Sequence, residues 1–170
     1  LWKGNGYWEA VAELDMKNRI QSCLGSLDLH ITRGLIDAVH SVIKNEVYAE
    51  QHKWDLNPDI INMSNGELHL EGATWVLKSH ERENYRITQI PHEFIPNAAC
   101  PKCEKFLSEI FAGDEDANIK RQSLLELVGY TLTNTVKFEK FVILIGLGAN
   151  GKSVFLELLA ELLGSKNVAA

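Results

Sequence analysis

The sequence has few cysteines and no long hydrophobic run. Its 170 residues include 3 Cys, an odd and small number that suits a reducing compartment better than a disulfide scaffold. No apolar run approaches the roughly 18 residues that a membrane-spanning helix needs, and the N-terminus lacks the basic-then-apolar layout of a secretory signal. We therefore expect a cytoplasmic protein that has no membrane partner.

The sequence also lacks an excess of positive charge. It contains 17 Lys and Arg against 23 Asp and Glu, a formal net charge of −6. This balance argues against a domain whose main surface binds nucleic-acid phosphates. If nucleic acid is a partner, the basic contacts are local or lie outside this chain. Because the chain starts at Leu1 and not at Met, we expect it to be part of a longer polypeptide.

Residues 1–135 mix helical and strand patterns. "LWKGNGYWEA" predicts a hairpin around Asn5-Gly6, and apolar spacing predicts helices over about 15–25 and 32–50, the second capped by Thr32. Strand-length runs separated by turn residues predict a small antiparallel β region; the runs are 59–63, 67–71, 74–79 and 85–90. Two further helices are expected from Pro101 and from about Asp114. The fold class is therefore α+β.

The stretch "KFVILIGLGANGKSVFLELLAELLG" carries the strongest motif. Residues 140–146 are typical of a strand buried on both faces of a parallel sheet, and residues 152–163 predict a helix that stops at Gly164. Between them, Gly146, Gly151, Lys152 and Ser153 occupy every fixed position of G-x-x-x-x-G-K-[ST]. Glycines let a phosphate chain approach bare backbone amides, and the helix N-terminus favours the same anion.

The motif predicts a site for ATP and Mg²⁺. Lys152 supplies a cation for the β- and γ-phosphates and is the predicted catalytic residue, while the Ser153 hydroxyl is the predicted magnesium ligand through ATP. The expected contacts with the nucleotide are Gly146, Gly148, Ala149, Asn150, Gly151, Lys152, Ser153 and Val154. The alternative is a glycine-rich strand-to-helix turn with an incidental lysine. Only "SKNVAA" follows the helix, so we expect the sheet to be incomplete and the fragment alone to be inactive.

Several segments resemble one protein family. "NGELHL", "PNAACPKCEKFLSEIF", "LLELVGYTLT" and the glycine-rich stretch occur in the order and approximate spacing of the phage/plasmid primase–helicases, and they also resemble the poxvirus-type primase–helicase. The resemblance covers about residues 57–164.

The resemblance implies a superfamily 3 helicase: an AAA+-like, usually homo-hexameric ring that uses ATP to move along single-stranded DNA during replication of phage, prophage or plasmid DNA. The setting would be the cytoplasm of a bacterial host or a phage-infected cell. Residues 1–135 would then be a collar-like N-terminal helicase-associated region. Residues 136–170 would be the first strand, P-loop and helix of an incomplete α/β AAA+-like ATPase domain.

Two other functions are compatible with the residues. One is a non-catalytic oligomerisation or docking module of a replication protein. The other is a P-loop phosphotransferase that acts on small molecules, although such enzymes usually carry the loop near the start of their domain. Loss of ATPase activity in Lys152→Ala would favour the helicase.

Other possible sites have simpler explanations. Cys100 and Cys103 have half the spacing of a zinc ribbon, but Pro101 between them also suits the first turn of a helix. The histidines lack metal-binding spacing and are interpreted as ordinary ones; they are His30, His40, His52, His69, His80 and His92.

Three further groups of residues also have a structural explanation. Asp114, Glu115 and Asp116 fit a solvated helix start. Residues 78–86 mix both charge signs and favour an exposed loop over a DNA contact. The large aromatic residues could stack bases, but without a flanking basic stripe packing is the favoured interpretation; they are Trp2, Tyr7, Trp8, Trp54 and Trp75.

Overall fold

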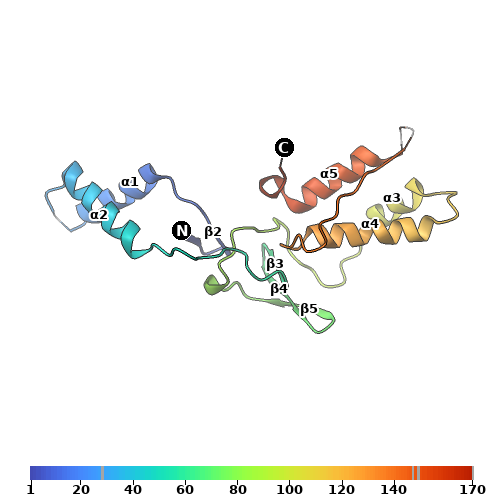
Figure 1. Ribbon diagram of the computed structural model, residues 1–170, viewed down its shortest axis with the longest axis horizontal. Helices are drawn as coiled ribbons and strands as arrows, with labels where there is room; N and C mark the ends of the chain where they lie inside the picture. The colour runs from blue at the N-terminus through green and yellow to red at the C-terminus, as the bar shows by residue number, and fades with distance from the viewer. Residues whose placement is uncertain (28, 147, 149, 170) are drawn as a thin grey trace.

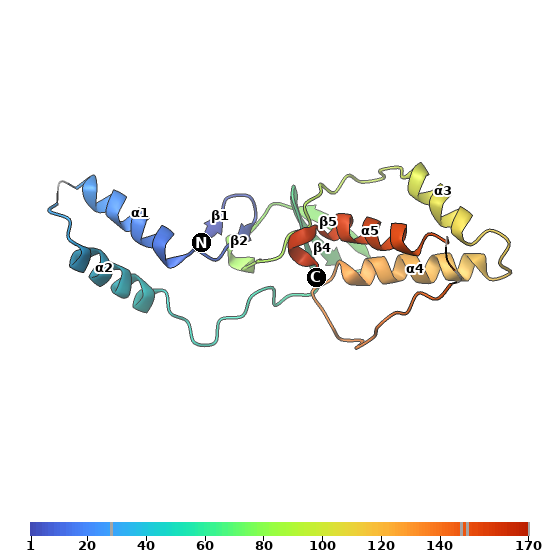
Figure 2. The same cartoon turned by 90° about the horizontal axis from the view of Figure 1, so that it is seen from above.

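The protein is an elongated α+β molecule. The computed structural model describes residues 1–27, 29–146, 148 and 150–169. A pair of helices lies at one end, a small sheet in the middle, and three helices at the other end (Figures 1 and 2). The described residues form five α-helices and a three-stranded antiparallel sheet, which confirms the α+β prediction. None of the helices in this described part is long and apolar enough to cross a membrane.

A hairpin opens the chain, as the sequence predicts. β1 (Trp2–Lys3) pairs antiparallel with β2 (Tyr7–Trp8), and Trp2 lies opposite Trp8. Gly6 in the turn has φ +100°, where L side chains are strained, and a Cβ at this position would overlap the ring of His80. The turn therefore requires glycine, and the hairpin is seated against the segment that follows the central sheet.

Helices α1 (Glu13–Gly25) and α2 (Arg33–Glu46) lie beside each other and apart from the other helices (Figures 1 and 2). The Thr32 hydroxyl accepts a hydrogen bond from the Leu35 amide at 3.2 Å, which confirms the predicted cap. Helix α1 begins after Ala12, before the expected Asp15. The pair is tied together by the Lys17 amine, 2.8 Å from a carboxylate oxygen of Asp37.

The central sheet has the order β3–β4–β5, with β3 at Ile60–Met63, β4 at Gly66–Glu71 and β5 at Thr74–Lys78. Ile61 pairs with Leu68, which in turn pairs with Leu77. The buried core residues Ile61, Met63, Leu68 and Ile90 lie together, and Leu132 and Leu163 from the C-terminal helices pack against them. The sheet thus connects the N-terminal part of the chain to the helices that follow.

The prediction of a strand over 85–90 is wrong. This segment makes one isolated bridge, between Met63 and Ile90. Tyr85 has φ +48°, which is incompatible with a strand. The amides of Ile87 and Thr88 donate to the carboxylate of Asp55 at 3.2 and 3.1 Å, and so they are not available to a β ladder. The Asp55 carboxylate, from a distant segment, thus accepts the hydrogen bonds that a neighbouring strand would otherwise accept.

Helices α3 (Pro101–Ile110), α4 (Ala117–Thr131) and α5 (Lys152–Leu163) form the third part. Their shared core contains the buried residues Leu107, Leu124 and Phe155. α5 has the predicted bounds, and Gly164 follows it with φ +81°. Pro101 occupies the first turn of α3, as expected.

The predicted buried strand before the glycine-rich loop is also wrong. Residues 140–146 form no strand, and the side chains of Phe141 and Ile145 are 84% and 89% exposed. A strand needs a neighbour to satisfy its amides and carbonyls. Within the described residues β1 pairs with β2, and β4 pairs with β3 on one side and with β5 on the other. Residues 140–146 therefore pair with no strand in the part of the chain that the structure describes, and of this run Leu144 packs instead against the core shared by the three C-terminal helices.

Candidate phosphate-binding site

The loop before α5 adopts conformations that need glycine. Gly148 has φ +110°, and Gly151, which caps the N-terminus of α5, has φ +79°. The Gly151 carbonyl accepts from the Phe155 amide at 2.9 Å and so begins the helical hydrogen bonding. The first amides of a helix lack intrahelical acceptors and carry the positive end of its dipole. The end of this loop therefore presents backbone donors to an anion.

Lys152 folds back over the loop. Its ammonium donates to Asn150 Oδ1 at 2.6 Å and to the Gly146 carbonyl at 3.2 Å. A Cβ on Gly146 would overlap the Asn150 amide and would lie 3.0 Å from Lys152 Nζ. The structure thus brings together four of the predicted residues, Gly146, Asn150, Gly151 and Lys152.

The remaining predicted residues lie between these four in the sequence or directly after them. Ser153 and Val154 occupy the first turn of α5 and are exposed, so the Ser153 hydroxyl is accessible to an ion. Gly148 is exposed as well. Ala149 lies outside the described residues.

Helix α3 packs against the loop, a contact that the motif did not reveal. A Cβ on Gly151 would lie 2.7 Å from Ile110 Cγ2 and 3.1 Å from Phe106 Cε2. These two side chains are one helical turn apart on the same face of α3. Gly151 is therefore needed for close approach as well as for its backbone conformation.

A cavity of about 250 Å³ opens beside the loop. Asn150, Gly151 and Lys152 line one side, and Asp114 and Lys120 line another. Lys120 pairs with Asp114 at 2.7 Å and with Asp116 at 2.8 Å. Hydrogen bonds to the two carboxylates raise the pKa of Lys120, and the same contact lowers the pKa of Asp116. Asp114 and Asp116 therefore serve as ion-pair partners, in addition to preceding a helix as predicted.

The other end of α5 is held by the segment that follows the central sheet. A Cβ on Gly164 would lie 2.7 Å from Pro91 Cγ. The His92 ring makes a hydrogen bond with the Glu161 carbonyl at 2.9 Å. Beyond the helix, Asn167 donates to the Gln89 carbonyl at 2.9 Å. Contacts from the preceding part of the chain thus fix α5 at both ends.

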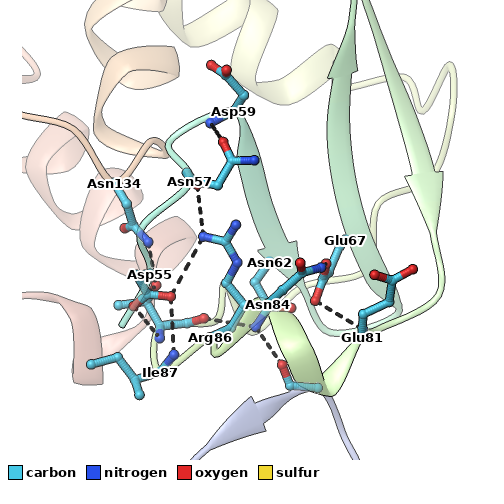
Figure 3. Close-up of polar contacts among 12 residues, drawn as sticks. Asp55, Asn57, Asp59, Asn62, Glu67, Glu81, Asn84, Arg86, Ile87 and Asn134 are labelled. Carbon is cyan, nitrogen blue, oxygen red and sulfur yellow. Dashed lines mark hydrogen bonds and ion pairs between the residues drawn. The ribbon is translucent and has the colours of Figure 1, made fainter. Parts of the chain in front are cut away.

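A second polar site lies inside the central sheet, and sequence reasoning missed it. Glu67 is 0% exposed and Arg86 is 1% exposed. The Glu67 carboxylate accepts from the Glu81 amide at 3.3 Å and from the side-chain amide of Asn84. Figure 3 shows Arg86 between Asn57, whose carbonyl accepts from Nη1 at 3.0 Å, and Asp55, 3.8 Å away. Arg86 is thus buried, contrary to the exposed loop expected over 78–86.

The burial of Arg86 is only partly compensated. Desolvation lowers the pKa of its guanidinium, and the charges of Asp55 and Glu67 act in the opposite direction. Nε and Nη2 are buried without a hydrogen-bond partner among the described residues. Because removal of a partner from a buried ion pair leaves an uncompensated charge, this network of Asp55, Glu67, Asn84 and Arg86 is a point at which the fold is easily broken. We call these four residues the buried polar network.

The two closely spaced cysteines are free thiols at the start of α3. Cys100 precedes the helix and is exposed, whereas Cys103 is half-buried against Leu107 and its neighbours. Burial, together with Cys100, raises the pKa of the Cys103 thiol. Within the described residues, no group of three or more His, Cys, Asp or Glu side chains could hold a metal ion. Cys100 and Pro101 stand at the beginning of α3, as the helix-start interpretation expects.

Comparison with known proteins gives one family. The family described as "D5 N terminal like" matches residues 2–112, which is more than half of the chain. The match includes α1, α2, the central sheet and α3. It ends before α4 and the glycine-rich loop. The curated proteins contain no match to this chain.

Proposed function

The chain belongs to the D5 N terminal like family, the N-terminal domain of D5-type primase–helicase proteins, and from this premise we propose that it takes part in ATP-dependent DNA unwinding during replication of phage, prophage or plasmid DNA. Membership places it among replication proteins. The proposal adds the motor: an AAA+-like P-loop ATPase that begins at about residue 136, after a collar-like region over residues 1–135. The parent would act as a homo-hexameric ring on single-stranded DNA.

The geometry of the loop supports an ATP site. One observation carries the proposal: the Lys152 ammonium lies at the N-terminus of α5, held by Gly146 and Asn150 at 3.2 and 2.6 Å. A phosphate group offers stronger, charged acceptors than this carbonyl and amide oxygen. It would therefore take their place on the ammonium while also accepting from the first amides of α5.

The residues fit the phosphate tail and a magnesium ion. Gly146, Gly148 and Gly151 place no Cβ atom at three positions of the loop, and Ser153, which is exposed, would meet Mg²⁺ through its hydroxyl; the ion neutralises phosphate charge when it is bound. The cavity of about 250 Å³ is slightly smaller than the roughly 300–1,000 Å³ of ligand pockets. It suits the phosphates, and the base and ribose would lie outside it.

The test is a titration of the chain with fluorescently labelled ATP and magnesium. Lys152→Ala removes a charge-assisted hydrogen bond of about 1.5–3 kcal/mol, so we expect affinity to fall roughly 10- to 100-fold. Lys44→Ala is the matched control, because Lys44 lies in the last turn of α2, a separate part of the molecule. If the two variants had the same affinity for ATP, the loop would not be the ATP-binding site. In the D5-type parent, Lys152→Ala should also abolish DNA-stimulated hydrolysis.

Exposed apolar residues favour a second candidate function, that of a docking module. They lie in the segment between α4 and α5 and on α5 itself, and they are Val136, Phe138, Phe141, Val142, Ile143, Ile145, Val154, Leu156 and Leu158. Where exposed apolar residues of this kind adjoin one another, they mark an interaction surface. Light scattering of the chain with and without Phe141→Asp and Ile145→Asp would test it. A self-associating chain that the charges make monomeric would support docking, and a monomer in both cases would oppose docking to a second copy.

A further inference from the structure

A group of aromatic rings gathers where the N-terminal hairpin meets the central sheet. Trp8 stacks on Tyr85 with ring centroids 5.8 Å apart. His52 lies edge-on, 4.4 Å from Trp54 and 4.3 Å from Tyr85. These four residues, from three separate segments, form what we call the aromatic cluster. Trp54 and Tyr85 remain 44% and 38% exposed, so the cluster offers ring surface to solvent and is more than hairpin packing.

The cluster carries its own positive charge. The guanidinium of Arg82 lies 5.2 Å from the ring centroid of Trp8. Arg82 and Lys53 are both exposed, and neither makes an ion pair within the part of the chain that the structure describes. Although no basic stripe is visible in the sequence, folding places the Arg82 cation over a ring of the cluster, and Lys53 stands between two members of the cluster in the sequence. Arginine beside aromatic rings is a recurring feature of sites for single-stranded nucleic acid.

The backbone beneath the cluster is strained and held in place. Tyr85 has φ +48°, and Asp55, next to Trp54, has φ +49°. Such values are costly for residues other than glycine and persist where the surroundings enforce them. The Asp55 amide donates to the Tyr85 carbonyl at 3.2 Å. The Asp55 carboxylate is fixed by the amides of Ile87 and Thr88, beside the buried Arg86 (Figure 3).

The interior of the domain thus determines how Trp54 and Tyr85 are displayed. Tyr85 is itself one of the two strained positions, between Asn84 and Arg86 of the buried polar network, and Trp54 directly precedes the other, Asp55. Rings that are already ordered lose little conformational freedom when a ligand binds. A hydrophobic cluster that served packing alone would gain nothing from leaving its rings part-exposed on a strained backbone.

We propose that the aromatic cluster stacks a base of single-stranded DNA, with Arg82 and Lys53 meeting the neighbouring phosphates. Every base has an aromatic face, and only unpaired bases can offer it fully. The net charge of −6 restricts the contact to a local site for one or two nucleotides. The choice of DNA rests on the proposed role in replication; the stacking geometry is independent of the ATP site.

The test is fluorescence anisotropy of a labelled oligothymidine titrated with the chain, without ATP or magnesium. Removing one stacking ring weakens binding by very roughly tenfold, and we expect this for Trp54→Ala. Trp54→Phe, which keeps an aromatic face, should lose much less. Trp75→Ala is the matched control: Trp75 is 37% exposed but lies on β5, outside the cluster, and its removal should leave affinity unchanged.

Charge provides a second measurement that does not disturb the rings. Arg82→Gln should weaken binding and make it less dependent on salt concentration, because one phosphate contact is removed. A duplex of the same length should compete poorly. Equal losses in Trp54→Ala and Trp75→Ala, an unchanged affinity in both Trp54→Ala and Arg82→Gln, or equal binding of duplex would each overturn the proposal.

The two proposals can fail separately. Lys152→Ala should have a lower affinity for ATP, but its affinity for the oligothymidine should equal that of the unchanged chain. Loss of ATP binding with intact stacking therefore concerns the loop alone, and loss of the oligothymidine with intact ATP binding concerns the aromatic cluster alone.

Discussion

Replacing Gly151 with alanine should destabilise the fold by about 2–5 kcal/mol in total. Two costs contribute. At φ +79° an L-residue is disfavoured by roughly 1–2 kcal/mol. The new Cβ would also lie 2.7 Å from Ile110 Cγ2 and 3.1 Å from Phe106 Cε2, well inside the ~3.5–4.0 Å at which carbon atoms pack. Such overpacking costs about 1–3 kcal/mol.

Urea unfolding followed by far-UV circular dichroism measures the loss. Gly72→Ala is the matched control: Gly72 has φ +65°, but nothing lies within 4 Å of its added Cβ. It should cost only the roughly 1–2 kcal/mol of the backbone conformation. The difference between the two variants isolates the contact with α3.

A double variant sharpens the test. With Ile110→Ala in place, the nearest atom to the added Cβ is gone, so Gly151→Ala should cost less in that background. A non-additivity of about 0.5–3 kcal/mol is typical of residues in contact. If Gly151→Ala and Gly72→Ala destabilised equally, α3 would not pack on the loop, and the reasoning would be refuted.

Three further predictions concern stability. Arg86→Met should cost about 3–5 kcal/mol in urea unfolding, because it takes the opposing charge from the buried Glu67 and the half-buried Asp55, whereas Arg33→Met on the surface should cost under about 0.5 kcal/mol. Leu107→Ala should cost about 2–5 kcal/mol by the same assay, because this buried side chain joins the cores of α3, α4 and α5. Lys17 lowers the pKa of the Asp37 carboxyl through a hydrogen bond, so this ion pair stabilises the fold above about pH 4 and is lost as the pH falls through the lowered pKa. Unfolding at decreasing pH should show the loss, and Lys17→Met should remove that part of the pH dependence.

Local chemistry made several elements predictable from the sequence. Asn5-Gly6 defines a turn because glycine tolerates the positive φ that the turn requires, and Thr32 caps α2 because its hydroxyl reaches an unpaired amide. Both depend on residues within a few positions of one another. The bounds of α5 follow in the same way from Gly151 and Gly164, each with φ near +80°.

The remaining features depend on contacts between distant segments. The buried polar network joins Asp55, Glu67, Asn84 and Arg86, and nothing local distinguishes Arg86 from the exposed charges around it. Residues 140–146 have the composition of a strand, but a strand forms only where another strand can pair with it. In the same way, Phe106 and Ile110 have ordinary core spacing, and their contact with Gly151 depends on how α3 meets α5.

The contacts at the two ends of α5 make this helix a strut. Its first residue adjoins Gly151, against which Phe106 and Ile110 pack, and its last turn is held by Pro91 and His92. Because both ends of α5 are in contact with other segments, the helix cannot shift along its axis without moving those segments as well. A displacement of the glycine-rich loop would therefore be delivered, nearly undiminished over the length of the helix, to the segment that leaves the central sheet.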